Sequence, residues 1–202
     1  MDILAFLQQP IIAIPIVIVT VAAIFASGRR WTALYVGLMP LINWAFAGIP
    51  TFPLPDVIGG GEWHPFTIVT GLVLVVRDFA QREIKHWIFG AMIVGLTLST
   101  LTAWPVIVVA SGVAFLISET VDWAVFTFIK RPLSQRIMIS STISAPLDQI
   151  VFIGLASFVV PGIFAWGSIL TGIVSKLVGA WVVSRFVAQE EKRTGKIEMN
   201  PA

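Results

Sequence analysis

Apolar runs long enough to cross a lipid bilayer recur along the whole chain. A hydrocarbon core about 30 Å thick needs a helix of about 20 predominantly apolar residues, and a helix satisfies its own backbone groups where lipid cannot. Hydrophobic residues make up 57% of the 202 residues and charged residues only 12%, and a soluble domain of this size could not bury so much apolar surface. The sequence therefore predicts an all-α membrane bundle of about seven transmembrane helices, at residues 10–27, 31–49, 66–80, 87–103, 106–129, 137–160 and 164–187.

Basic residues alternate from one connection to the next, and this alternation predicts the orientation. Lys and Arg follow the first, third, fifth and seventh runs, at Arg29, Arg30, Arg82, Lys85, Lys130, Arg131, Arg136, Lys192, Arg193 and Lys196. The other connections, residues 50–65, 104–105 and 161–162, contain neither type. Because connections rich in Lys and Arg stay on the cytoplasmic side, we expect the N-terminus outside and the C-terminus inside. Asp2 and no basic residue precede the first run, so we interpret that run as a retained helix and not as a signal peptide.

The residue types exclude several classes of function. The chain has no cysteine, which rules out a disulfide framework, a thiolate metal site and a cysteine nucleophile. Its basic residues are confined to short connections, as in membrane topology and unlike a nucleic-acid-binding surface. We expect no metal site and no cofactor. The connection at 50–65 holds four prolines and the glycines 59–61, which predict an irregular outer loop able to cover the mouth of a cavity.

Ionisable residues inside the apolar runs are the main candidates for function. They are Arg77, Asp78, Glu119, Asp122, Asp148 and Lys176. A charge at the bilayer centre costs about 2.5 to 3.5 kcal/mol on insertion scales, so those in mid-span must face a polar interior. Glu119 and Asp122 are three residues apart and share one helical face, whereas Asp148 and Lys176 lie near the midpoints of their runs. Lys176 either pairs with a carboxylate and only holds the bundle together, or belongs to a binding site; three carboxylates against one ammonium favour a site.

Two of the carboxylates occupy equivalent places in a repeated pattern. Residues 118–126 and 144–152 share a serine at the first position, an aspartate at the fifth and a phenylalanine at the ninth. The two helices are expected to run in opposite directions, and inverted repeats of this kind are typical of secondary transporters. Pro146 lies two residues before Asp148 and removes a backbone donor. Two readings stay open for Pro146: a helix broken to line a cavity, or a simple kink filled by nearby hydroxyl groups.

From Asn43 to about Phe186, the chain resembles the vitamin uptake transporter family, also called the queuosine precursor transporters. Members carry a serine, a glutamine and an aspartate in each of two successive helices, followed by a phenylalanine. The positions that match are Asn43, Trp63, Pro65, Phe66, Asp78, Ser118, Asp122, Phe126, Ser144, Asp148, Phe152 and Lys176. The chain departs from the family where Glu119 and Ala145 replace the two glutamines, and where residues 85–87 replace a glycine.

The resemblance implies one membrane domain over residues 1–202. Residues 1–30 would be an extra N-terminal helix, residues 31–187 the six-helix transporter core, and residues 188–202 a cytoplasmic tail. It also implies a multi-pass protein of the cytoplasmic (inner) membrane that is a transporter and not an enzyme. Whether the protein is a homo-oligomer stays open.

The substrate implied is nucleobase-like: a 7-deazaguanine, such as 7-cyano-7-deazaguanine or its aminomethyl derivative. A carboxylate can accept two parallel hydrogen bonds from the N1–H and amino edge of such a ring, and aromatic side chains can stack on its face. The expected substrate-binding residues are Asn43, Asp78, Glu119, Asp122, Trp123, Phe126, Asp148, Phe152 and Lys176.

A retinal-binding, rhodopsin-like protein is the alternative. Seven helices, an outside N-terminus and a lysine midway along the last helix also describe that class, with Lys176 as the Schiff base and Glu119, Asp122 or Asp148 as its counter-ion. Gly172 stands four residues before Lys176, where rhodopsins place an aspartate, so the transporter is the preferred reading.

Overall fold

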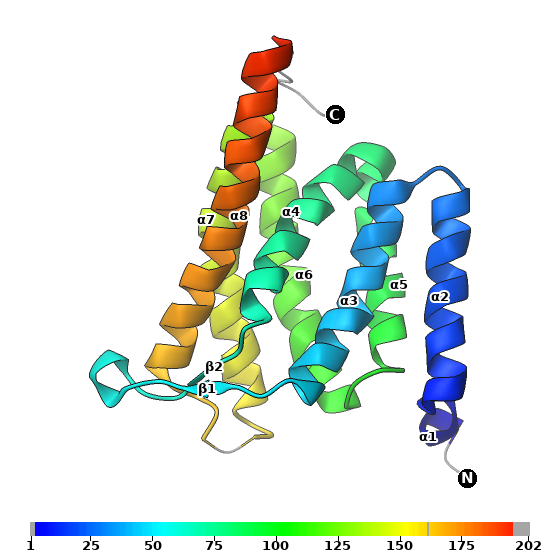
Figure 1. Ribbon diagram of the computed structural model, residues 1–202, viewed down its shortest axis with the longest axis vertical. Coiled ribbons are helices and arrows are strands. Elements are labelled where there is room, and N and C mark those ends of the chain that lie inside the picture. The colour runs from blue at the N-terminus through cyan, green and yellow to red at the C-terminus, as the bar shows by residue number, and fades with distance from the viewer. Residues whose placement is uncertain (1–2, 161, 196–202) are drawn as a thin grey trace. The chain divides into compact units, whose positions relative to one another are not determined.

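The protein is helical almost throughout its described length (Figure 1). The computed structural model describes residues 3–160 and 162–195, without the side chains of Ala47, residues 105–107 and Phe126. It is 80% helical, which confirms the predicted all-α membrane bundle. The helices are α1 (Ile3–Leu7), α2 (Pro10–Ala26), α3 (Arg30–Gly48), α4 (Thr67–Ile84), α5 (Ile88–Ser99), α6 (Pro105–Phe128), α7 (Leu133–Ala156) and α8 (Trp166–Thr194), with short 3₁₀ turns η1 (Asp56–Ile58) and η2 (Lys85–Trp87) and strands β1 (Phe52–Pro53) and β2 (Glu62–Trp63).

Helices α2 to α8 coincide with the seven predicted apolar runs. Among the described helices, α6, α7 and α8 are long and apolar enough to cross a membrane by length and composition alone, and α2 is a shorter apolar helix. The main differences are at helix ends. Helix α7 begins four residues earlier than predicted, at Leu133, and α8 continues seven residues further, to Thr194. Both extensions are largely polar, and hydrogen bonds connect them. The carboxylate of Glu191 in α8 accepts hydrogen bonds from the backbone N–H and the hydroxyl of Ser134 in α7.

The chain folds as two compact units. The first unit is Met1–Ile49 with Val76–Val109, and the second is Pro50–Val75 with Ala110–Ala202. The boundaries between the units therefore fall inside α4 and α6.

In the first unit, α3 packs against both α2 and α5. A glycine allows each close approach: Gly37 of α3 faces Val21 of α2, and Gly95 of α5 lies against the side chain of Met39. Asn43 Nδ2 donates to Ser99 Oγ at 3.1 Å and so ties α3 to α5. Such interhelical hydrogen bonds are a common means of fixing helix pairs in membranes.

In the second unit, α7 and α8 lie side by side. The buried face of α8 consists largely of small residues, including Gly172, Ser175 and Gly179. Gly71, at the start of α4, lies directly against the backbone of Lys176, and Gly179 lies against the backbone of Ile68. Small residues at these positions let helix backbones approach closely, the usual packing mode in membranes.

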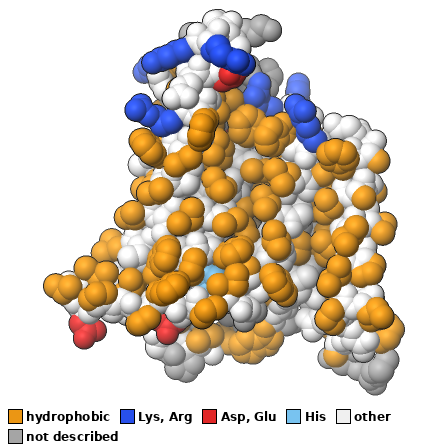
Figure 2. Space-filling view, in the orientation of Figure 1, with side chains coloured by type: hydrophobic (Ala, Val, Ile, Leu, Met, Phe, Trp, Pro, Cys, Tyr) orange, Lys and Arg blue, Asp and Glu red, His pale blue; other side chains and the backbone are white. Residues whose placement is uncertain are grey.

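Helix α8 has the exposure pattern expected of a helix whose solvent is lipid. Val174 and Leu170 are 58% and 55% exposed, whereas Lys176 on the same helix is only 3% exposed. Hydrophobic side chains cover the visible sides of the helices, and Lys and Arg side chains gather around the C-terminal end of α8 (Figure 2). A soluble helix would present the opposite arrangement.

The connection at 50–65 is more ordered than predicted. Strands β1 and β2 form an antiparallel pair, with Phe52 opposite Trp63. The turn between them is allowed by Gly59, Gly60 and Gly61, whose φ angles of 99°, 62° and 86° are accessible to glycine. Ser168 Oγ accepts a hydrogen bond from Glu62 N–H and donates one to Glu62 O, fastening the hairpin to the start of α8.

The broken-helix reading of Pro146 is wrong. Helix α7 runs without interruption from Leu133 to Ala156 and includes this proline. Proline removes only one backbone donor, and the other hydrogen bonds of a 24-residue helix hold it together. Pro146 therefore marks a site of local backbone weakness in α7 and not the end of a helix.

Candidate functional site

A buried ion pair between α7 and α8 lies at the centre of the candidate site. Lys176 Nζ lies 2.5 Å from Asp148 Oδ2, and the two side chains are 4% and 11% exposed. Asp148 Oδ1 also lies 3.5 Å from the Ser118 hydroxyl of α6, at the long limit of a hydrogen bond. The ion pair therefore connects α7 with α8 and borders α6.

The repeated pattern forms a matched set of polar side chains on α6 and α7. Ser118 and Asp122 are four residues apart on α6, as are Ser144 and Asp148 on α7, and all four are buried. Only four residues connect the two helices, so the helices run in opposite directions. Ser118 lies opposite Asp148. Asp122 follows Ser118 by four residues on α6, and Ser144 precedes Asp148 by four residues on α7. The register of the repeat therefore puts Asp122 and Ser144 at one level.

Ser144 is notable within this set. Its hydroxyl is buried and has no hydrogen-bond partner among the described residues. A buried hydroxyl without a partner carries a desolvation cost that a bound ligand or water would offset. Ser144 is thus an available polar group at the level of Asp122 in the repeat.

Glu119 and Asp122 are almost completely buried, at 1% and 0% exposure. Their placement on one face of α6 agrees with their spacing of three residues. Burying carboxylates at this depth requires compensating hydrogen bonds or positive charge.

Arg136 changes the predicted charge balance. It was assigned to a connection, but the structure places it inside α7 with 0% exposure. Arg136, Ser140, Ser144 and Asp148 recur every four residues and form one buried polar stripe along α7. The buried charges of the described second unit are therefore three carboxylates and two cations, an excess of one negative charge and not of two.

Two of the three predicted aromatic contacts have described side chains, Trp123 on α6 and Phe152 on α7. Trp123 and Phe152 are partly buried, and Trp123 packs edge-to-face against Phe128 with ring centroids 6.0 Å apart. The side chain of Phe126 lies outside the described residues. A stacking role for these rings stays a prediction.

Asn43 and Asp78 belong to the first unit and are both buried. Asn43 Nδ2 donates to Met39 O and Ser99 Oγ, which fits a role in holding helices together. Asp78 Oδ1 accepts a hydrogen bond from Arg77 Nη1 at 3.0 Å. Adjacent residues of a helix usually point in different directions, but here the Arg77 side chain reaches the Asp78 carboxylate. Arg77 is fully buried, because its long side chain can fold back to the adjacent carboxylate.

Trp63 is a contact that the sequence did not assign to the site. Its indole Nε1–H donates to Ser175 Oγ at 2.8 Å, one residue from Lys176. The β1–β2 hairpin therefore reaches the same stretch of α8 that carries the buried ammonium group. The aromatic position was visible in the sequence, but its partner depends on the fold.

An exposed ion pair lies outside the candidate site. Arg193 Nη2 donates to Glu190 Oε1 at 2.8 Å near the exposed end of α8. This hydrogen bond and the carboxylate charge raise the pKa of Arg193 above its ordinary value, so the guanidinium stays protonated. Among the described residues, no group of three or more His, Cys, Asp or Glu side chains is arranged to hold a metal ion.

The fold and the buried charges define a multi-pass membrane protein with a polar interior. The chain belongs to the vitamin uptake transporter family. The family model, described as "Putative vitamin uptake transporter", matches residues 66–189, which include the repeated pattern and Lys176. No curated protein and no solved structure matches the chain. The family is one of transporters for small molecules, and its match does not support the retinal-binding alternative.

Proposed function

We propose that the protein imports a queuosine precursor, a 7-deazaguanine such as 7-cyano-7-deazaguanine or its aminomethyl derivative, across the inner membrane. The observation that carries the proposal is the set of buried carboxylates on α6 and α7, Glu119, Asp122 and Asp148. A guanine-like ring presents N1–H and an amino group on one edge, and an ionised carboxylate accepts both. The site would face a cavity during transport, since such charges are too costly against lipid.

We assign a separate role to the carboxylate that is held in the ion pair. Asp148 is already bonded to Lys176, so we assign it to positioning and charge balance. We assign Glu119 and Asp122 to the ring edge because both carboxylates lie on one buried face of α6. Trp123 and Phe152 would stack on the ring. The roles of Asn43, Asp78 and Phe126 stay predictions from the sequence.

Uptake by cells tests this proposal. Cells unable to make 7-deazaguanines should accumulate the labelled base when they express the protein, and Asp122→Asn should lower the initial rate by about ten-fold or more, since a hydrogen bond to a charged group contributes about 1.5 to 3 kcal/mol. Thr120→Val, at an exposed position on the same helix, is the control and should transport normally. Accumulation no faster than in cells without the protein would rule out the proposed substrate.

Glu119 should determine which 7-deazaguanine is preferred. A carboxylate in place of the family's glutamine adds negative charge, which favours the cationic aminomethyl compound over the neutral cyano compound. We expect a preference of about ten-fold for the aminomethyl compound, lost in Glu119→Gln. Competition between the two compounds for uptake measures it. Equal uptake of both, unchanged by Glu119→Gln, would contradict the assignment.

A further inference from the structure

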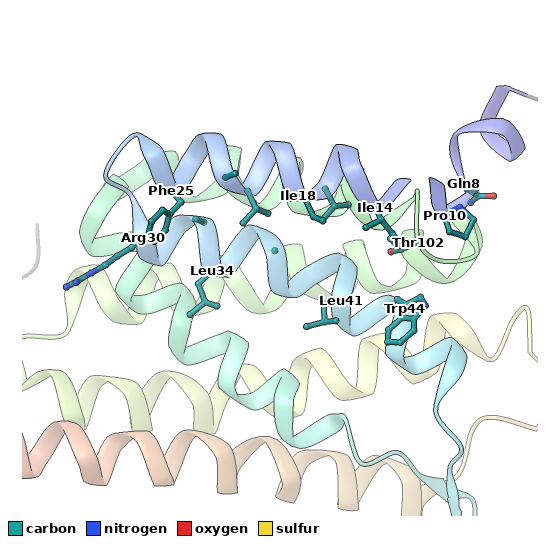
Figure 3. Close-up of a pocket in the computed structure, with 15 residues that line it drawn as sticks. Gln8, Pro10, Ile14, Ile18, Phe25, Arg30, Leu34, Leu41, Trp44 and Thr102 are labelled. Carbon is teal, nitrogen blue, oxygen red and sulfur yellow. The ribbon is translucent and has the colours of Figure 1, made fainter. Parts of the chain in front are cut away.

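The groove between α2 and α3 in the first unit is lined mainly by hydrophobic side chains (Figure 3). Its volume is about 980 Å³. Two of its polar groups, Gln8 Nε2 and the Thr102 hydroxyl, already donate to backbone carbonyl groups. A nucleobase-like substrate would therefore find few polar partners in this groove. In the second unit, by contrast, polar contacts lead from the β1–β2 hairpin to the candidate site.

Two polar anchors fasten the β1–β2 hairpin to α8. At the first, Ser168 Oγ accepts a hydrogen bond from Glu62 N–H at 2.9 Å and donates one to Glu62 O at 2.8 Å. At the second, Trp63 Nε1–H donates to Ser175 Oγ at 2.8 Å. Ser168 and Ser175 are about two helical turns apart, so the end of the hairpin lies along one side of α8.

Both anchors adjoin the Asp148–Lys176 ion pair. Ser175 directly precedes Lys176 in the chain. Ser168 O accepts a hydrogen bond from Gln149 Nε2 at 3.3 Å, and Gln149 directly follows Asp148. Each member of the buried pair is therefore next in the chain to a residue that holds the hairpin or its anchor.

The hairpin depends on these anchors for its position. Each of its strands has only two residues, and isolated two-stranded hairpins are at best marginally stable in water. Val57 and Phe52 are 90% and 54% exposed, so burial of apolar surface contributes little to holding the hairpin on α8. Segments of this kind open locally at low free-energy cost, and the lids of binding sites are drawn from them.

We propose that the β1–β2 hairpin is a lid of the candidate site. Docked on α8, it keeps water from the ion pair on that side, and when Glu62 and Trp63 release their anchors it admits the substrate. The pattern of Lys and Arg predicts this side to be the outer one. The inference rests on the proposed function for the identity of the site, but the movement of the lid does not depend on which substrate is carried.

The reaction of a single buried thiol tests the lid. The chain has no cysteine, so Ser144→Cys carries the only thiol, at a position that is 0% exposed. A charged methanethiosulfonate reagent should modify this thiol slowly in the purified full-length chain in detergent. Adding Trp63→Phe, which keeps an aromatic ring but removes the N–H donor, should raise the rate about five-fold. Adding Ser168→Ala instead, which removes two hydrogen bonds, should raise it about twenty-fold.

Two matched controls separate the lid from general loosening of the bundle. Trp166 is 61% exposed at the start of α8 and packs edge-to-face on Phe164, so Trp166→Phe should leave the rate at Ser144→Cys unchanged. Ser184 is buried further along α8 from both anchors. A thiol at Ser184→Cys should react at the same rate with and without Trp63→Phe.

Three results would overturn the proposal. These are a rate at Ser144→Cys that neither Trp63→Phe nor Ser168→Ala raises, an equal rise with Trp166→Phe, or an equal rise at Ser184→Cys. The measurement uses no substrate, so its outcome is independent of uptake. Thiol rates that rise as expected, without uptake of 7-deazaguanines, would reject the proposed substrate alone, whereas uptake with unchanged thiol rates would reject the lid alone.

Discussion

Lys176→Met should destabilise the protein more than any other single change discussed. Removing the ammonium leaves the Asp148 carboxylate buried without its ion-pair partner, and breaking a buried pair on one side costs about 3 to 5 kcal/mol. We expect a large fall in the unfolding midpoint in detergent and little folded protein in membranes. Lys192→Met, at an exposed position near the end of α8, is the control and should have almost no effect.

The double variant Lys176→Met with Asp148→Asn separates structure from transport. It removes both charges, and replacing a buried pair by neutral groups is often close to neutral for stability. The unfolding midpoint should therefore largely recover. If uptake stays absent while folding recovers, the pair belongs to the transport site; recovery of both would leave it a purely structural link between α7 and α8. A Lys176→Met protein as stable as the wild type would contradict the described contact.

Gly71→Ala should be the second strongly destabilising change. A methyl group at residue 71 would collide with the backbone Cα, C and O atoms of Lys176, and backbone cannot move aside as a side chain can. Overpacking of this kind costs about 1 to 3 kcal/mol. The shift would also displace the segment of α8 that carries the ammonium group, so uptake should fall with stability.

Gly154→Ala is the matched control for this prediction. Gly154 is also helical, but a methyl group there meets nothing within 4 Å. Alanine is favoured over glycine inside a helix by about 0.5 to 1 kcal/mol, so Gly154→Ala should be neutral or slightly stabilising. Thermal unfolding in detergent compares the two. Equal midpoints for the two variants would show that the close approach at Gly71 is not present.

Hydrophobic length alone was enough to predict the helices. Lipid imposes one requirement on every span, and runs such as 106–129 and 164–187 therefore correspond closely to α6 and α8. Helix ends were harder to predict. The polar turns that begin α7 at Leu133 and end α8 at Thr194 depend on tertiary contacts, such as the hydrogen bond between Ser134 and Glu191. The hairpin at 52–63 was also missed, since its order comes from contacts with Ser168 and not from its own sequence.

Site residues could be predicted from the sequence where their spacing along a helix identifies them. They could not be predicted where their role depends on a contact partner elsewhere in the fold. The spacing of Ser118, Asp122, Ser144 and Asp148 predicted buried polar positions on two helices, and all four side chains are buried. Arg136 was missed because a basic residue near a helix end usually reaches water, although its spacing of four residues from Ser140 could have revealed it. The Arg77–Asp78 contact depends on a side-chain conformation that sequence does not specify. The orientation, the single domain over 1–202 and the substrate contacts stay predictions.

Transport by the purified protein alone tests the central claim most directly. Proteoliposomes containing the wild-type chain should accumulate labelled 7-deazaguanine with time, faster than proteoliposomes containing Asp122→Asn at the same protein content. No other protein is present, so accumulation can only come from this chain. Uptake equal to that of protein-free liposomes, with the protein shown to be folded by its unfolding midpoint, would contradict the proposal that the buried carboxylates of α6 and α7 carry this substrate across the membrane.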